Sequence, residues 1–152
     1  MVPGVAHEAE PTSRFQHLVS DPISAAKLRQ AVCVSLESTV ADAIDVMKKK
    51  KIGYVLVTND EGKLAGLFAE GDVFYKVAGT DLDIAKATVG SLMAPHVIAL
   101  QQSSPIAYAL HLMDLHGYRH IPVVDDDDRP VGILSFRVAL KFVDDLYGAK
   151  TG

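Results

Sequence analysis

The first half of the chain shows two spacings of apolar residues, and each predicts a type of element. Between residues 40 and 47, apolar side chains fall at i, i+3, i+4 and i+7, which is the spacing of one helical face. Ser38 stands just before this run, and we expect it to cap the helix. A short apolar run at 32–34 precedes the cap and is typical of a strand.

A hairpin and a second helix follow. The apolar runs 54–58 and 63–68 flank the tetrapeptide Asn-Asp-Glu-Gly, a pattern typical of two strands joined by a short loop. Residues 70–78 then predict a helix, because Gly79 directly after them is a natural helix end.

The same order of elements recurs 66 residues further along the chain without a gap. Ser38 becomes Ser104, which is followed by Pro105 at a first-turn position. The hairpin also recurs, and so does the closing helix, which runs from Phe136 to about residue 147. Because each unit alone would leave an apolar sheet face uncovered, we predict an α+β fold in which tandem β-α-β-β-α repeats with pseudo-two-fold symmetry pack through their sheets.

The repeats predict the organisation of the whole chain. We expect a flexible tail, a first repeat with an N-terminal lead-in, a connector, a second repeat and a short tail, at residues 1–14, 15–79, 80–95, 96–147 and 148–152. The closing helix has more apolar positions than a one-sided surface helix needs. It therefore either meets a partner chain or covers the intramolecular core.

Composition and charge narrow the classes of protein. The formal net charge of -4 argues against a nucleic-acid partner or an anionic membrane surface. The single cysteine, Cys33, excludes an intramolecular disulfide and is expected to be a small core residue. We find neither a basic leader nor an apolar run of bilayer length, so we expect a cytoplasmic protein. The six histidines form no ligand motif, so no metal is expected.

Two turns from strand to helix, at 66–72 and 132–138, carry the candidate chemistry. Each places backbone N–H groups and short polar side chains where a phosphate or a ribose can bind. The first turn ends in Asp72, and the second contains Ser135. Taken alone, Asp72 is also an ordinary acidic residue for a first helical turn, and Ser135 is also an ordinary helix cap.

Four segments together resemble the CBS (cystathionine β-synthase) domain, and their duplication resembles the tandem pair called a Bateman module. The segments are VGSLM at 89–93, VIAL at 97–100, GYRHIPVVD at 117–125 and GILS at 132–135. The resemblance covers roughly residues 20–147.

The resemblance implies a non-catalytic regulatory module. Such modules bind adenosine-containing ligands (AMP, ADP, ATP, S-adenosylmethionine or NAD) in clefts between the two repeats, signal to a partner protein and form homodimers. The ligand is regulatory, and none is expected to be obligatory. In this sequence the resemblance assigns ribose binding to Asp72 and phosphate binding to Ser135. It also places Arg137 in the second turn, and it leaves Ala69 without the phosphate hydroxyl in the first.

Further residues are implied at the clefts by their place in the repeats. Val55, Leu67, Ile121 and Ile133 would enclose the adenine, the strand entries contribute Gly53, Tyr54, Tyr118, Arg119 and His120, and Lys27, Arg29 and His96 are additional candidates. We expect the better site to contain Asp72, with a basic strand-entry residue (Arg119 or His120) holding the phosphate. The other cleft is then altered or empty.

Several alternatives stay open. Neither turn holds both a hydroxyl residue and an aspartate, so the alternative function is an interaction or dimerisation module with vestigial clefts. Arg119 and His120 are otherwise ordinary surface residues at a strand start. The four aspartates at 125–128 form either a cation site or a solvated turn, and so short a loop favours the turn. The sequence has no Ser/His/Asp triad, paired-acid or Walker motif, so we expect no enzyme.

Overall fold

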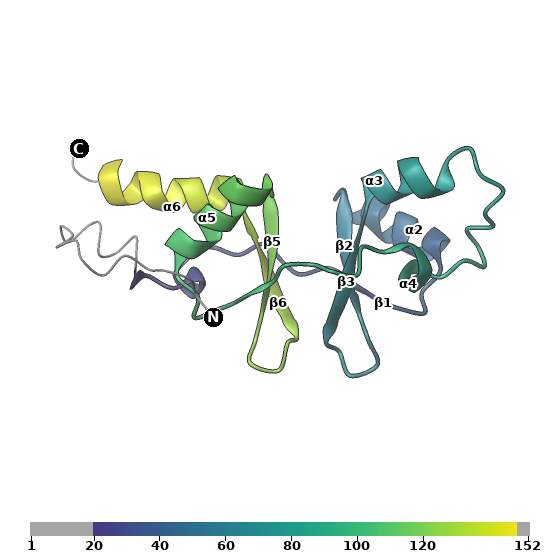
Figure 1. The fold of residues 1–152 in the computed structure, drawn as a ribbon, viewed down its shortest axis with the longest axis horizontal. Helices are drawn as coiled ribbons and strands as arrows, with labels where there is room; N and C mark the ends of the chain where they lie inside the picture. Colours follow the sequence, from purple (N-terminus) through teal and green to yellow (C-terminus); the bar gives the residue numbers. More distant parts are fainter. Residues whose placement is uncertain (1–19, 149–152) are drawn as a thin grey trace. The chain divides into compact units, whose positions relative to one another are not determined.

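The computed structural model describes residues 20–148, which divide into two units (Figure 1). The first-repeat unit comprises residues 30–98 and 124–131, and the second-repeat unit comprises the other described residues. Each repeat contributes a three-stranded sheet with helices, which confirms the predicted mixed helix and sheet fold class. The predicted tail at 1–14 and all but the first residue of the tail at 148–152 lie outside the described residues.

The first-repeat unit is built on a sheet with strand order β1-β2-β3. Its strands are β1 (Cys33–Ser35), β2 (Tyr54–Thr58) and β3 (Leu64–Ala69). Its helical elements are α2 (Val40–Lys50), α3 (Glu70–Asp72), the π-helical turn η2 (Val73–Val77) and α4 (Val89–Leu92). β1 pairs parallel with β2, while β2 and β3 form the predicted antiparallel hairpin.

α2 buries its predicted apolar face in the core of this unit. The core consists of Val40, Ala43, Met47, Val55, Val57, Phe68 and Val89. The predicted cap is wrong by one residue, because the Thr39 hydroxyl accepts the N–H of Asp42 at 3.1 Å and Thr39 is the N-cap. The Ser38 hydroxyl accepts the N–H of Ser35 at 3.1 Å and so closes the turn before the helix.

The sheet of the second repeat has the order β4-β5-β6. Its strands are β4 (Leu100–Gln101), β5 (His120–Val124) and β6 (Pro130–Ser135). The helical elements are η1 (Ile23–Ala25), α5 (Ile106–His116) and α6 (Phe136–Gly148), and α5 packs against α6. Pro105 lies at the N-cap of α5 and not at its first helical position, so the predicted place of this proline is wrong by one residue.

In each unit, a segment that lies outside the three strands forms an isolated β-bridge with the third strand. In the second-repeat unit, Arg29 and Ile133 exchange two backbone hydrogen bonds of 2.9 Å each. In the first-repeat unit, Ala94 and Leu67 exchange bonds of 2.9 and 3.1 Å. Leu67 and Ile133 are equivalent positions of the two repeats, so Ala94 and Arg29 are structural equivalents as well.

A glycine in the third strand allows each segment to approach so closely. A Cβ atom on Gly132 would lie 2.9 Å from the Cβ of Leu28, and one on Gly66 would lie 2.6 Å from the carbonyl oxygen of Ala94. Real Cβ atoms do not tolerate such distances, so a side chain at either position would push the segment away. The segment that carries Arg29 is therefore held against β6 because residue 132 is glycine.

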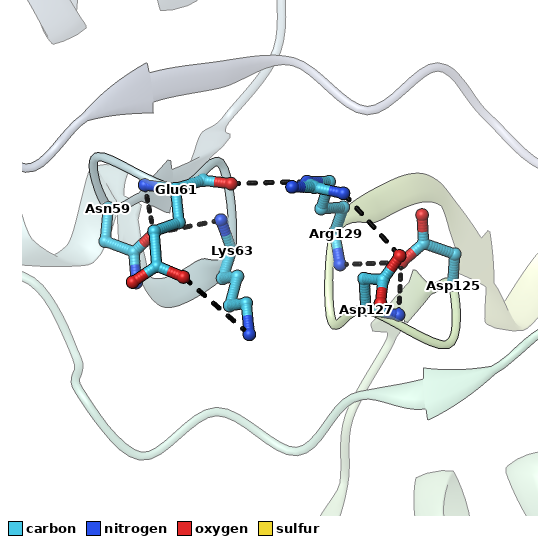
Figure 2. Close-up of polar contacts among 6 residues, drawn as sticks. All are labelled: Asn59, Glu61, Lys63, Asp125, Asp127 and Arg129. Carbon is cyan, nitrogen blue, oxygen red and sulfur yellow. Dashed lines mark hydrogen bonds and ion pairs between the residues drawn. The ribbon is translucent and has the colours of Figure 1, made fainter.

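The two hairpin loops contact each other within the first-repeat unit (Figure 2). The Arg129 Nε donates to the carbonyl oxygen of Glu61 at 3.2 Å, and the same guanidinium pairs with Asp127 at 3.6 Å. A backbone hydrogen bond of 2.9 Å runs from the N–H of Leu64 to the carbonyl oxygen of Asp128. The second repeat's loop thus contributes both a backbone acceptor and a side-chain donor to the first repeat's hairpin.

The acidic loop at 125–128 is itself a hydrogen-bonded turn. The Asp125 carboxylate accepts the N–H groups of Arg129 and Asp127 at 3.0 and 2.8 Å (Figure 2). The bond from Arg129 is the largest cause that lowers the pKa of Asp125. Among the described residues we find no group of three or more acidic, histidine or cysteine side chains that could hold a metal ion.

Cys33 is exposed, so its predicted place in the core is wrong. Side chains alternate along a strand, and the neighbouring Val34 packs against the core, which directs Cys33 to the other face of β1. Within residues 20–148, no helix has the length and apolar character needed to cross a membrane.

Candidate ligand-binding site

Five of the predicted site residues surround one cavity in the second-repeat unit. The cavity has a volume of about 210 Å³ and is lined by Arg29, Arg119, His120, Ser135, Phe136 and Arg137. Three of these side chains carry a guanidinium group, and none carries a carboxylate. A cavity with this lining attracts an anion, because fixed positive charges and hydrogen-bond donors converge on one small volume.

Ser135 lies at the end of β6, where the strand turns directly into α6. Its residue is only 2% exposed, and its hydroxyl oxygen accepts the N–H of Val138 at 3.1 Å. The predicted alternative role of Ser135 as a helix cap is therefore confirmed. A hydroxyl that accepts one hydrogen bond still has its proton to donate, so capping and phosphate binding are compatible. The positive end of the α6 dipole adds to the potential at this turn.

Arg119 is held in place by Phe136 at the entry to α6. The carbonyl oxygen of Arg119 accepts the N–H of Phe136 at 2.7 Å, and its guanidinium lies 4.7 Å from the centre of the Phe136 ring. This cation–π contact restricts the long side chain at little electrostatic cost, because the ring face is electron-rich. The neighbouring Tyr118 stacks on His116 and does not line the cavity.

Arg29 and His120 complete the cavity from two other segments. Arg29 reaches it through the antiparallel pairing of its segment with β6. Burial, and then the charge of Arg29, lower the pKa of His120 below its ordinary value of 6.5. Both causes favour the neutral imidazole, so the cationic character of the cavity comes mainly from its arginines.

Arg119, Phe136 and Arg137 also line a neighbouring cavity of about 620 Å³ in the same unit. The other lining residues there are Leu140, Lys141 and Asp144, all from α6. The small cationic cavity thus opens beside a larger space of mixed character along the same helix.

The equivalent turn of the first repeat lacks these cations. Gly53, Gly71 and Ala94 stand at the positions equivalent to Arg119, Arg137 and Arg29. Glu70 stands at the position equivalent to Phe136 and lies so close to Gly53 that a Cβ atom there would meet its carboxylate at 3.2 Å. The first-repeat turn therefore offers an acidic group at the position where the second has an aromatic ring beside arginines.

Asp72 is occupied within its own turn. One carboxylate oxygen accepts the N–H of Ala69 at 2.8 Å, and the other pairs with the Lys76 ammonium at 2.9 Å. Lys76 also donates to the carbonyl oxygen of Leu92 at 2.8 Å, which ties this turn to α4. The first-turn role of Asp72 is thus confirmed, and its role in ribose binding stays a prediction.

The other predicted site residues lie apart from the cationic cavity or deep in the fold. Val55, Ile121 and Ile133 are fully buried, Gly53, Tyr54, Leu67 and Ala69 are half-buried, and Lys27 and His96 are exposed. Val55 belongs to the core cluster of its unit, so it contacts α2. Phe136 was not predicted as a site residue, although its place directly after Ser135 was a signal for it.

Comparisons with known proteins agree with this architecture. The family model of the CBS domain matches residues 23–79 and 89–145, which is more than half of the chain. The chain therefore belongs to the CBS-domain family, and it carries the family's domain twice in tandem. The predicted resemblance is confirmed.

Three relatives illustrate the similarity. Arabinose 5-phosphate isomerase KdsD of Pseudomonas aeruginosa is 32% identical over 108 residues, which is 71% of this chain and 33% of the relative. A CBS-domain containing protein from Agrobacterium tumefaciens is 29% identical with a TM-score of 0.63, over 75% of this chain and 90% of that one. CBSX2 in complex with AMP has the same fold at 23% identity and a TM-score of 0.68, over 83% of this chain and 98% of that one.

The first three curated relatives are longer proteins than this chain. The chain spans a third or less of the length of the first three curated relatives, with 33, 18 and 19% of each covered. In these three proteins, the part similar to this chain is joined to further segments.

Proposed function

We propose that this chain is a regulatory module that binds an adenine nucleotide through its phosphate, at the cationic cavity of the second-repeat unit. The observation that carries the proposal is the convergence of Arg29, Arg119 and Arg137 with the Ser135 hydroxyl at the start of α6. Charge-assisted hydrogen bonds from arginine to phosphate are among the strongest polar contacts in proteins. CBSX2, which shares the fold, is known in complex with AMP.

The size of the cavity supports a phosphate as its occupant. Its volume of about 210 Å³ is below the roughly 300–1,000 Å³ that encloses a drug-sized ligand. A phosphate group fits this space, and the nucleoside extends beyond it. Phosphorylated ligands (AMP, ADP, ATP or NAD) are accordingly favoured over S-adenosylmethionine, whose sulfonium is positively charged and would face three arginines.

The regulatory role follows the family. We propose that the module has no catalytic activity of its own, acts in the cytoplasm and passes the presence of the nucleotide to a partner protein. A conformational response requires that the nucleotide bind two states of the module with different affinities.

Calorimetric titration tests the proposal directly. AMP and ATP should bind with micromolar to millimolar affinity, while adenosine and S-adenosylmethionine should bind at least about tenfold more weakly, since removing the phosphate removes the charge-assisted contacts. Absence of nucleotide binding at millimolar concentration would contradict the proposal. Equal affinities for AMP and adenosine would contradict the phosphate role of the cavity.

The alternative function is an interaction module with vestigial clefts. The occupied Asp72 carboxylate and the missing cations of the first-repeat turn favour it for that turn. The ultraviolet spectrum of the purified protein separates the two functions. The sequence contains no tryptophan, so co-purified nucleotide would shift the absorbance maximum visibly towards 260 nm, at which adenine absorbs.

Lowering the pH is expected to strengthen nucleotide binding through His120. Its pKa lies below 6.5 in this structure, and a bound phosphate would raise it, so protonation and binding favour each other. Between about pH 8 and about pH 6, AMP affinity should rise several-fold more for the unchanged chain than for His120→Gln. The variant controls for the titration of the phosphate itself, and parallel pH profiles would refute the role of His120.

A further inference from the structure

The first-repeat unit has an apolar groove that is lined by α2, residues 51–53 and the α3–η2 segment. Its volume of about 430 Å³ lies within the roughly 300–1,000 Å³ that is typical of small-molecule sites. The apolar side chains that line it are Ile44, Met47, Ile52, Val73 and Phe74. The Phe74 residue is 72% exposed. An apolar group bound in the groove would cover this ring, and removing apolar surface from water favours binding.

The groove differs in its chemistry from the equivalent place in the second repeat. There, the Arg119 guanidinium lies 4.7 Å from the centre of the Phe136 ring. The first repeat has Gly53 and Glu70 at these two positions, and both residues line the groove. A Cβ atom on Gly53 would meet the Glu70 carboxylate at 3.2 Å, so the two residues are neighbours. The first repeat thus offers a carboxylate here, while residue 53 supplies no cation to neutralise it.

Three charged side chains at the groove form no ion pair among residues 20–148. They are Lys48, Lys51 and Glu70, and all three are exposed. Lys49 belongs to the same basic run but differs, since it pairs with Asp45 at 2.8 Å and does not line the groove. The groove therefore combines an apolar lining with two available cations and one available anion.

We infer that this groove binds a free apolar α-amino acid, such as leucine, methionine or phenylalanine. The ammonium group of the ligand meets the Glu70 carboxylate, its carboxylate meets Lys48 and Lys51, and its side chain lies among the apolar residues. Charge-assisted hydrogen bonds form at both ends of such a zwitterion. A purely anionic amphiphile would instead face Glu70, and a purely cationic one would face the two lysines. Each would desolvate a charge without a partner, which is costly.

Calorimetric titration with L-phenylalanine tests the inference. Measured without nucleotide, its dissociation constant should lie below about 1 mM, and the result is independent of the proposed nucleotide function. Phenylpropionate lacks the ammonium group, phenylethylamine lacks the carboxylate, and L-alanine lacks the apolar side chain. Each should bind at least about tenfold more weakly, because each loses one of the three contacts. Absence of L-phenylalanine binding at about 10 mM would overturn the inference, as would equal affinities for L-phenylalanine and phenylpropionate.

Variants at the two ends of the groove assign the charges. Glu70→Gln should weaken L-phenylalanine binding about tenfold without weakening phenylpropionate, which has no ammonium group to lose its partner. Lys48→Gln combined with Lys51→Gln should show the opposite selectivity, with L-phenylalanine weakened and phenylethylamine not. A purely structural effect of either change would weaken all ligands alike. Lys49→Gln is the matched control and should leave the L-phenylalanine affinity unchanged, because Lys49 does not line the groove.

Two further outcomes would overturn the inference. One is a Glu70→Gln variant that binds L-phenylalanine as tightly as the unchanged chain. The other is a Phe74→Lys variant that converts a dimeric chain into monomers in analytical ultracentrifugation, since a second copy would then occupy the groove. Far-ultraviolet circular dichroism verifies that each variant is folded.

Discussion

Replacement of Arg119 by alanine is expected to weaken AMP binding about 10- to 100-fold. The change removes a guanidinium from the cationic cavity, and a hydrogen bond to a charged group contributes roughly 1.5–3 kcal/mol. The contact between this guanidinium and the Phe136 ring at the entry to α6 is lost as well. Arg119→Lys should lose less, because it keeps the charge but not the planar fork.

Arg129→Ala is the matched control for this measurement. Arg129 is also exposed and also bridges two segments, but it belongs to the hairpin loops of the first-repeat unit. Calorimetry should find AMP affinity unchanged in Arg129→Ala and adenosine affinity unchanged in both variants. An Arg119→Ala variant that binds AMP as tightly as the unchanged chain would remove this cavity from the proposed function.

The repeat made most of the fold predictable. A shift of 66 residues aligned two sets of strands and helices, and the structure contains both sets. The errors are local. Thr39 and Ser38 are both good caps, so only the backbone geometry decides between them. Cys33 has apolar neighbours on both sides, and a three-residue strand is too short for alternation to reveal which side chains point inward.

The cationic cavity was only partly predictable. The residue types at positions 119, 135 and 137 were visible, but their convergence with Arg29 depends on a backbone pairing between segments about 100 residues apart. The preference for Asp72 comes from the resemblance to the CBS domain, since taken alone this residue is also an ordinary acidic residue for a first helical turn. Lys76 stands four residues later, which is ion-pair spacing on a helix, and this spacing indicates that the Asp72 carboxylate is paired within its own turn.

Alanine at Gly132 is expected to reduce both stability and AMP affinity. The new Cβ would lie 2.9 Å from the Cβ of Leu28 and 3.1 Å from the carbonyl oxygen of Arg29. Relief of this contact requires the segment to move away from β6, and overpacking of this kind costs about 1–3 kcal/mol. Because Arg29 moves with the segment, AMP affinity of the folded protein should fall about tenfold, the effect of losing one charge-assisted contact.

The equivalent change at Gly66 separates the two effects. Its Cβ would lie 2.5 Å from the Met93 sulfur and 2.6 Å from the carbonyl oxygen of Ala94, so Gly66→Ala should lower the urea midpoint at least as much as Gly132→Ala. The segment it displaces carries alanine where the second repeat has Arg29, so AMP affinity below the unfolding transition should stay unchanged. Equal losses of AMP affinity in the two variants would show that Gly132 acts only through stability and that Arg29 does not contact the phosphate.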